Sequence, residues 1–175
     1  FIAIKLLKEG ITDKFINGPI IKKNFLNKKY LGITEYLADN FSINITAMLI
    51  YNEKLSVCPI TTHLPLKMVS KKLNSKIIFE KIMLINSFYK KKLSFIPKIA
   101  VLGLNPHCES ILKKNEDEII LKPIIKKLRK YNSKISGPYS ADTIFIKKNR
   151  EKFDVIVGMY HDQVLTPMKT LFEYD

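Results

Sequence analysis

The sequence is poor in cysteine, arginine and glycine, has no tryptophan and has no long apolar run. Only two cysteines occur among 175 residues, and they do not form a CxxC pair. This excludes a disulfide-stapled scaffold and favours a reducing, cytoplasmic setting. The apolar runs, such as residues 45–51 and 119–121, are far shorter than the roughly 18 to 20 residues that span a bilayer. We therefore expect a soluble cytoplasmic protein that does not bind a membrane.

The six glycines form neither GxGxxG nor GxxxxGK[ST], so the sequence carries no dinucleotide fingerprint and no P-loop. With 46% hydrophobic and 26% charged residues, the chain has an ordinary globular composition and should bury a core. It contains no Gly/Ser linker and no repeat, so we assign no internal domain boundary within residues 1–175. Residue 1 is Phe and no signal-peptide cleavage site follows, so we expect that the natural N-terminus lies upstream.

Acidic residues are outnumbered by basic ones, 16 against 30, which gives a formal net charge of +14. A strongly basic chain is typical of nucleic-acid binders, so a non-catalytic nucleic-acid-binding protein is one hypothesis. However, Arg129 and Arg150 are the only arginines, and arginine is the side chain best suited to paired contacts with bases and phosphates. The lysines are scattered in twos and threes. We therefore favour a solvated, lysine-rich surface and no nucleic-acid partner.

Short apolar runs alternate with longer amphipathic segments, which predicts an α/β fold with a largely parallel sheet. The predicted strands are residues 14–17, 45–51, 55–60, 98–104 and 154–159. The predicted helices are residues 1–10, 34–39, 65–73, 76–92 and 116–131. Thr34 is a candidate N-cap of its helix, and Pro123 should kink or split the last one.

All three histidines, His63, His107 and His161, come shortly after a predicted strand. The carboxyl ends of strands are where open α/β sheets bind ligands, so the three imidazoles could converge on one metal ion. Their wide spacing matches no local metal signature, and three unrelated surface or core histidines remain an alternative. Cys108 is either a fourth ligand or, as we favour, a small buried filler.

Two carboxylates lie near these histidines in the sequence. Asp162 follows His161 directly, and Asp142 follows the turn at residues 137–139, so either could orient an imidazole or move a proton. The local sequence favours a second interpretation of Asp142, as the cap of a short helix at residues 143–148. Lys22 and Lys169 could hold a phosphate or carboxylate, although in a lysine-rich chain each is also expected as solvated surface.

Six stretches, taken together and in this order, resemble the 4-hydroxythreonine-4-phosphate dehydrogenase (PdxA) family. They are Gly18-Pro-Ile-Ile-Lys22, Gly32-Ile-Thr-Glu35, Thr61-Thr-His-Leu-Pro-Leu66, Gly103-Leu-Asn-Pro-His107, Gly137-Pro-Tyr-Ser-Ala-Asp-Thr143 and Met159-Tyr-His-Asp-Gln163. The resemblance implies an α/β/α layered fold of the isocitrate/isopropylmalate dehydrogenase type, of which this chain is the central part. The N- and C-terminal parts of the family chain are absent. Because that fold lacks the Rossmann glycines, the missing GxGxxG does not exclude NAD.

The resemblance also implies a reaction, the NAD- or NADP-dependent oxidation and decarboxylation of 4-phosphooxy-L-threonine to 3-amino-2-oxopropyl phosphate in pyridoxal phosphate (vitamin B6) biosynthesis. It implies a divalent metal (Zn, Mg or Co) in a site shared across a homodimer interface. The implied metal ligands are His63, His107 and His161; the catalytic residues are Asp142, Asp162 and Lys169; the substrate contacts are Thr34, Lys169 and Lys22. Most cofactor contacts would lie beyond residue 175, so this piece alone should be inactive.

The sequence departs from the family pattern at two places. Ile33 stands where the family has a substrate-binding histidine, and residues 108–115 replace a glycine-rich loop. The first change leaves an alternative open within the same class, a PdxA-like dehydrogenase of a four-carbon acid phosphate such as threonate or erythronate 4-phosphate.

Overall fold

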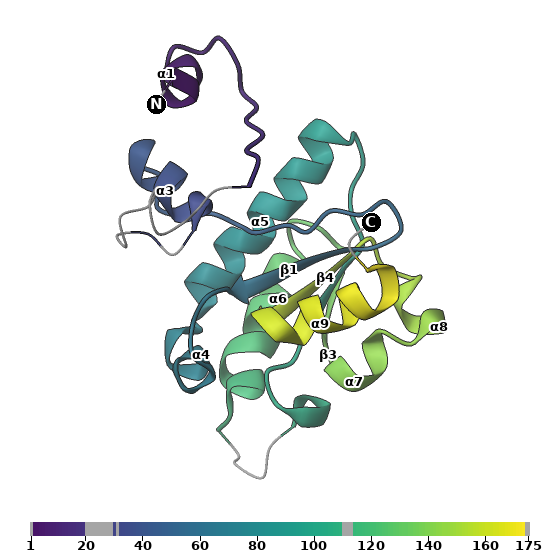
Figure 1. Cartoon of the computed structure of the whole chain (residues 1–175). Helices are drawn as coiled ribbons and strands as arrows, with labels where there is room; N and C mark the ends of the chain where they lie inside the picture. Colours follow the sequence, from purple (N-terminus) through teal and green to yellow (C-terminus); the bar gives the residue numbers. More distant parts are fainter. Residues whose placement is uncertain (1, 20–29, 31, 110–113, 174–175) are drawn as a thin grey trace. The chain divides into compact units, whose positions relative to one another are not determined.

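The computed structural model describes residues 2–19, 30, 32–109 and 114–173 (Figure 1). Lys22, a predicted substrate contact, lies outside these residues. The chain forms two compact units, Phe1–Thr46 and Ala47–Asp175. None of the helices within the described ranges is long and apolar enough to cross a membrane.

The first unit contains two helices, α1 (Ile2–Lys8) and α3 (Ile33–Asn40), and neither buries a residue. The predicted strand at residues 14–17 is wrong. This segment is extended, but it lacks a partner strand among the described residues, and Ile16 is 96% exposed. The N-cap of α3 is Gly32, so the prediction that Thr34 caps this helix is also wrong.

The second unit is built on one parallel sheet. Its strands are β1 (Ser56–Thr61), β2 (Ile99–Leu102), β3 (Ile135–Tyr139) and β4 (Val155–Tyr160). They lie in the order β1-β4-β2-β3, and every pairing is parallel. The carboxyl ends of all four strands therefore meet at one edge of the sheet, the edge at which open α/β sheets bind ligands.

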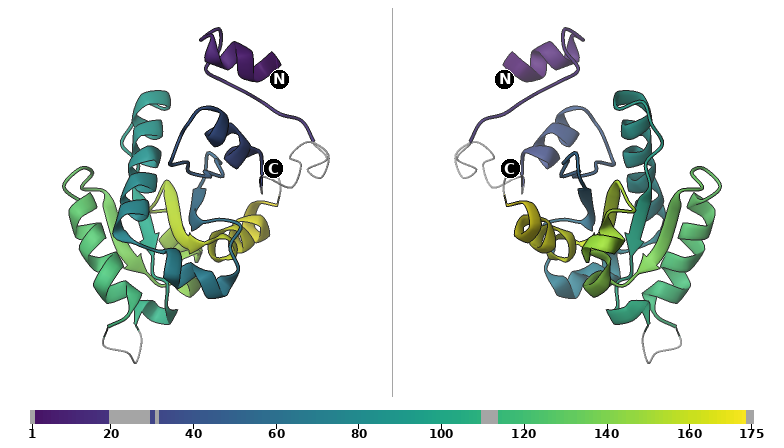
Figure 2. Two further views of the ribbon diagram at one scale, coloured as in Figure 1. Left: turned by 90° about the vertical axis from the view of Figure 1, so that its left-hand side faces the viewer. Right: turned by 90° about the vertical axis from the view of Figure 1, so that its right-hand side faces the viewer.

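Helices cover both faces of this sheet, and Figure 2 shows the resulting layers. One face packs against α4 (Leu66–Lys72), α5 (Ser75–Lys92) and α6 (Lys122–Leu128), and the other against α7 (Ala141–Ile144) and α9 (His161–Phe172). A further short helix, α8 (Lys147–Arg150), follows α7.

Strand residues alternate between the two layers of core. On β4, Val155 and Val157 join the core under α5 and α6, whereas Ile156 joins the core under α9. This period of two is expected of a strand buried on both faces. The predicted α/β/α layering is confirmed.

Residues 45–51 were predicted to be a strand, and this is wrong apart from one bridge. Ile50 pairs with Val57 in an isolated antiparallel bridge. The apolar pattern has another cause, because Leu49 packs against the core of one sheet face and Met48 against the core of the other. Burial alone thus produced a strand-like pattern without a ladder of backbone hydrogen bonds.

Pro123 was predicted to kink or split the helix expected at residues 116–131. A π-helical turn, η2 (Asp117–Leu121), runs directly into α6, and Pro123 lies in the first turn of α6, so the helix changes type beside Pro123 without a break. Proline is tolerated there because the first backbone N–H groups of a helix have no partner within it.

Strand β3 was not predicted, because Gly137 and Pro138 within it are strong turn signals. Gly137 has φ +139°, and a Cβ at this position would lie 2.4 Å from the carbonyl oxygen of Val101. Only glycine allows the two strands to approach so closely, at a point where the β2–β3 register shifts.

Candidate metal and substrate site

Each strand of the sheet ends beside a candidate site residue. His63 follows β1, His161 follows β4, His107 follows β2, and Asp142 follows β3. The common direction of the strands therefore brings all four to the same edge, as the sequence predicted for the histidines.

Two of the histidines form a pair. The ring centroids of His63 and His161 are 6.0 Å apart, with 38° between the ring planes. The sheet positions them directly, because β1 and β4 are neighbours and Thr61 lies opposite Tyr160 in the register. We call these two residues the histidine pair.

His161 is the first residue of α9, and its Nδ1 lies 2.6 Å from Oδ1 of Asp162. With the carboxylate accepting the Nδ1 proton, Nε2 keeps its lone pair and is the nitrogen available to a metal. His63 lies beside this ring, and neutral imidazole is a preferred ligand of divalent transition metals, so the histidine pair offers two donors of a kind that such a metal binds.

His107 is held in a different way, in the short helical turn η1 (Pro106–Cys108). Its backbone is left-handed, with φ 57°, and so is that of Cys108, with φ 59°. Its Nδ1 lies 3.8 Å from Oδ2 of Asp142, but both side chains are more than half exposed, so any attraction between them is weak.

Asp142 is not the helix cap that its local sequence favoured. The N-cap of α7 is Ser140, and the Ser140 hydroxyl donates a 2.6 Å hydrogen bond to Oδ1 of Asp142. This hydrogen bond, together with the nearby positive charge of a protonated His107, lowers the pKa of Asp142 below its ordinary value.

The three histidines do not converge within one chain. Among the described residues, no group of three or more His, Cys, Asp or Glu side chains is placed to hold one metal ion. A single chain thus supplies the histidine pair and, separately, the turn that carries His107.

Two hollows lie at the ends of strands β3 and β4, and one of them also adjoins the His107 turn. One of about 300 Å³ lies between the η1 turn and the start of α7, with His107, Asp142 and Tyr160 in its lining. The other, of about 540 Å³, runs along α7 and α9, with Asp162 and Thr166 in its lining. Asp142 and Tyr160 line both hollows, and each hollow is a concave surface large enough for a small organic acid.

The remaining predicted residues are placed as follows. Lys169 is exposed on α9, two turns beyond His161. Thr34 belongs to α3 of the first unit. Cys108 is only 8% exposed, and burial raises the pKa of its thiol, with the charge of Asp117 adding to the effect. This inert, buried thiol agrees with the filler that we favoured over a metal ligand.

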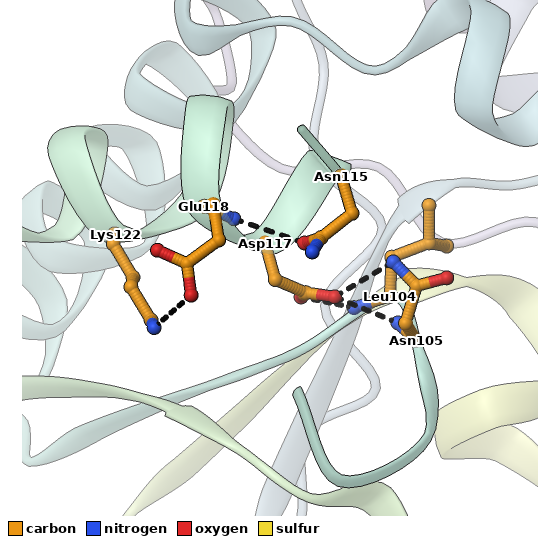
Figure 3. A network of polar contacts seen from close by, with 6 residues as sticks. All are labelled: Leu104, Asn105, Asn115, Asp117, Glu118 and Lys122. Carbon is orange, nitrogen blue, oxygen red and sulfur yellow. Dashed lines mark hydrogen bonds and ion pairs between the residues drawn. The ribbon is translucent and has the colours of Figure 1, made fainter. Parts of the chain in front are cut away.

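Two buried polar residues support these strand ends and were not predicted to do so. Gln163 accepts a hydrogen bond from the Met159 amide at 2.7 Å and donates one to the Gly103 carbonyl at 2.8 Å, so it ties β4 to the end of β2. Asp117 accepts hydrogen bonds from Leu104 and Asn105, just before the η1 turn (Figure 3). In the sequence, Asp117 was only one of three acids at a helix start, and nothing there indicated its burial.

Comparison with known proteins identifies the family. The profile described as "Pyridoxal phosphate biosynthetic protein PdxA" matches residues 2–174. The 4-hydroxythreonine-4-phosphate dehydrogenases of Sulfurihydrogenibium sp. and Aquifex aeolicus are 41% and 40% identical to it, each over 97% of this chain and 53% and 52% of the relative. The crystal structure of the Klebsiella pneumoniae enzyme superimposes with a TM-score of 0.84 at 34% identity, covering 98% of this chain and 54% of that one. The chain spans about half the length of these relatives, and it belongs to the PdxA family.

Proposed function

We propose that the full natural polypeptide containing this sequence is an NAD(P)-dependent 4-hydroxythreonine-4-phosphate dehydrogenase of pyridoxal phosphate biosynthesis. The observation that carries the proposal is the histidine pair at the carboxyl edge of the sheet, in a chain that aligns with such dehydrogenases over 97% of its length. In the reaction, the secondary hydroxyl of the substrate gives up a proton and a hydride, the hydride reduces NAD(P)⁺, and the resulting β-keto acid loses CO₂.

Each side chain has a role in this proposal. His63 and His161 hold a divalent metal that, when bound, withdraws charge from the reacting hydroxyl. Asp162 keeps His161 in the tautomer that leaves Nε2 free to ligate. Asp142 is a carboxylate at neutral pH and has the lone pairs to accept the hydroxyl proton, although its lowered pKa makes it a weaker base than an ordinary aspartate. Lys169 and Thr34 bind the substrate, Lys169 as a positive charge for the phosphate or carboxylate.

The separation between His107 and the histidine pair is explained if the metal site is shared between two copies of the chain in a homodimer. One copy would supply the pair and the other would supply His107, which completes a three-histidine site. A metal held by three histidines would have room to bind the substrate hydroxyl as well, as in catalytic sites with three protein ligands.

Turnover by the full polypeptide tests the proposal. With 4-phosphooxy-L-threonine, a divalent metal and either nicotinamide cofactor, we expect reduced cofactor and CO₂ to form in equal amounts. H63A is the inactive comparison. Absence of reduced cofactor with every metal and both cofactors would refute the proposed reaction.

The four-carbon acid phosphates are the second candidate substrates, because Ile33 replaces a polar substrate contact with an apolar side chain. The same assay with threonate 4-phosphate and erythronate 4-phosphate separates the two functions by their kcat/KM ratio. An I33H variant sharpens the comparison. If 4-phosphooxy-threonine is the natural substrate, histidine at this position should leave the preference for it unchanged or increase it.

A further inference from the structure

The carboxylate of Asp117 is fully buried and is aimed at the backbone that leads into the His107 turn (Figure 3). Its Oδ1 accepts the N–H of Leu104 at 2.8 Å, and its Oδ2 accepts the N–H of Asn105 at 3.0 Å. The side-chain amide of Asn105 donates a third hydrogen bond to Oδ2, also at 2.8 Å. One carboxylate therefore holds two consecutive backbone amides and the side-chain amide of the second residue.

The position of this acid in its own helical segment makes its burial tolerable. Asp117 lies in the first turn of the π-helical segment that continues into α6, where the helix dipole favours a negative charge. A buried carboxylate without partners would be strongly unfavourable, whereas one with three N–H donors has its charge largely satisfied.

The turn that directly follows the two residues held by Asp117 has an uncommon backbone conformation. His107 and Cys108 both have positive φ values, a conformation that non-glycine residues adopt only when their surroundings impose it. Close packing on the inner side of the turn adds to the constraint. A Cβ on Gly103 would lie 2.7 Å from Sγ of Cys108 and 2.8 Å from Oδ1 of Asp117, so the turn and the carboxylate both crowd the α-carbon of Gly103 and leave no room for a side chain there.

We infer that Asp117 is a positioning residue for His107, which sets the direction of that imidazole through the backbone of residues 104–107. This inference rests on the proposed role of His107 as a metal ligand. It extends that role to a residue that touches neither the histidine nor the concave surface described above. Residues outside the first ligands can change metal affinity roughly 10- to 100-fold when they orient a ligand.

The experiment compares D117N with E118Q in the full polypeptide. D117N keeps the side-chain volume but places an NH₂ group against a backbone N–H donor. E118Q removes an acid from the same helical turn, but Glu118 is partly exposed and pairs with Lys122. Both variants are titrated with Co²⁺, whose visible absorption reports the geometry of its ligands. Hydrogen exchange of the segment 103–108 is measured on the metal-free proteins.

For D117N, at a temperature where circular dichroism shows it folded, we expect roughly 10- to 100-fold weaker Co²⁺ binding, an altered Co²⁺ spectrum and faster exchange in residues 103–108. E118Q should match the wild type in all three. Wild-type Co²⁺ affinity in folded D117N, or an equal loss in E118Q, would overturn the inference.

Two further variants keep the test decisive. If D117N does not fold, N105A replaces it, since it removes one of the three hydrogen bonds and leaves the carboxylate in place; wild-type Co²⁺ affinity in N105A then overturns the inference. H107A separates the inference from the proposed function. If H107A binds Co²⁺ as the wild type does, the proposed ligand is wrong. If H107A loses Co²⁺ and folded D117N does not, only the role of Asp117 is wrong.

Discussion

The histidine pair and the His107 turn lie at the same edge of one sheet, yet they are built by different means. His63 and His161 follow two paired strands directly, so the backbone ladder between β1 and β4 sets their distance. His107 lies on a left-handed turn, and the backbone just before this turn is hydrogen-bonded to the buried Asp117 side chain. Changes to buried side chains far from the ligands should therefore disturb the turn more readily than the pair.

The largest expected effect is the loss of metal when a proposed ligand is removed. In the full polypeptide we expect H63A, H107A and H161A each to retain only background levels of divalent metal after dialysis, measured by elemental analysis. K130A, a change at an exposed charged residue, should retain the wild-type amount. Because the Asp117 variant keeps all three ligands, it should weaken binding without abolishing it. Unchanged metal content in all three histidine variants would show that none of these histidines is a metal ligand.

The next effect concerns Gln163, which is hydrogen-bonded both to β4, the strand before His161, and to Gly103, which precedes the His107 turn. Q163A leaves the Met159 amide and the Gly103 carbonyl without their hydrogen-bond partner in a buried setting. Each unpaired group costs about 1 to 3 kcal/mol, so for the two groups together we expect the free energy of unfolding to fall by about 2 to 6 kcal/mol in urea titrations.

T170A is the matched control for Q163A. It removes an exposed hydroxyl of the same helix, whose hydrogen bond is local to α9. Its free energy of unfolding should stay within about 0.5 kcal/mol of the wild type. Equal losses in the two variants would show that Gln163 does not link the two strand ends.

The contrast between the histidine pair, set by strands, and the His107 turn, set by buried side chains, also explains what could be predicted from the sequence. Strands β1, β2 and β4 were predicted because each is a short apolar run, and a histidine after such a run is visible without a structure. Strand β3 was not, because Gly137 is a turn signal in the sequence but serves a close approach to Val101 in the fold.

The supports of the site were harder to predict than its candidate ligands. Asp117 and Gln163 act on residues more than ten positions away in the chain, such as Leu104 and Gly103. Local patterns carry no information about such pairings. The segment at residues 45–51 shows the opposite error, since burial on two faces imitated a strand that has only one bridge.

The smallest effect concerns the pKa of Asp142 in the His107 half of the site. Its pKa is lowered chiefly by the Ser140 hydroxyl and then by the charge of His107, so S140A should raise it more than H107A does. A carboxyl whose pKa is lower in the folded state stabilises the fold above its unfolded pKa and loses this contribution as the pH falls through the lowered value. In S140A, the free energy of unfolding should therefore fall less than in the wild type as the pH drops into the acid range. Carbon-13 NMR titration of the Asp142 carboxyl measures the shift. A larger rise of the Asp142 pKa in H107A than in S140A would show that the charge of the His107 ring, and not the Ser140 hydroxyl, mainly lowers this pKa. The His107 turn would then interact with Asp142 more strongly than expected for two exposed side chains 3.8 Å apart.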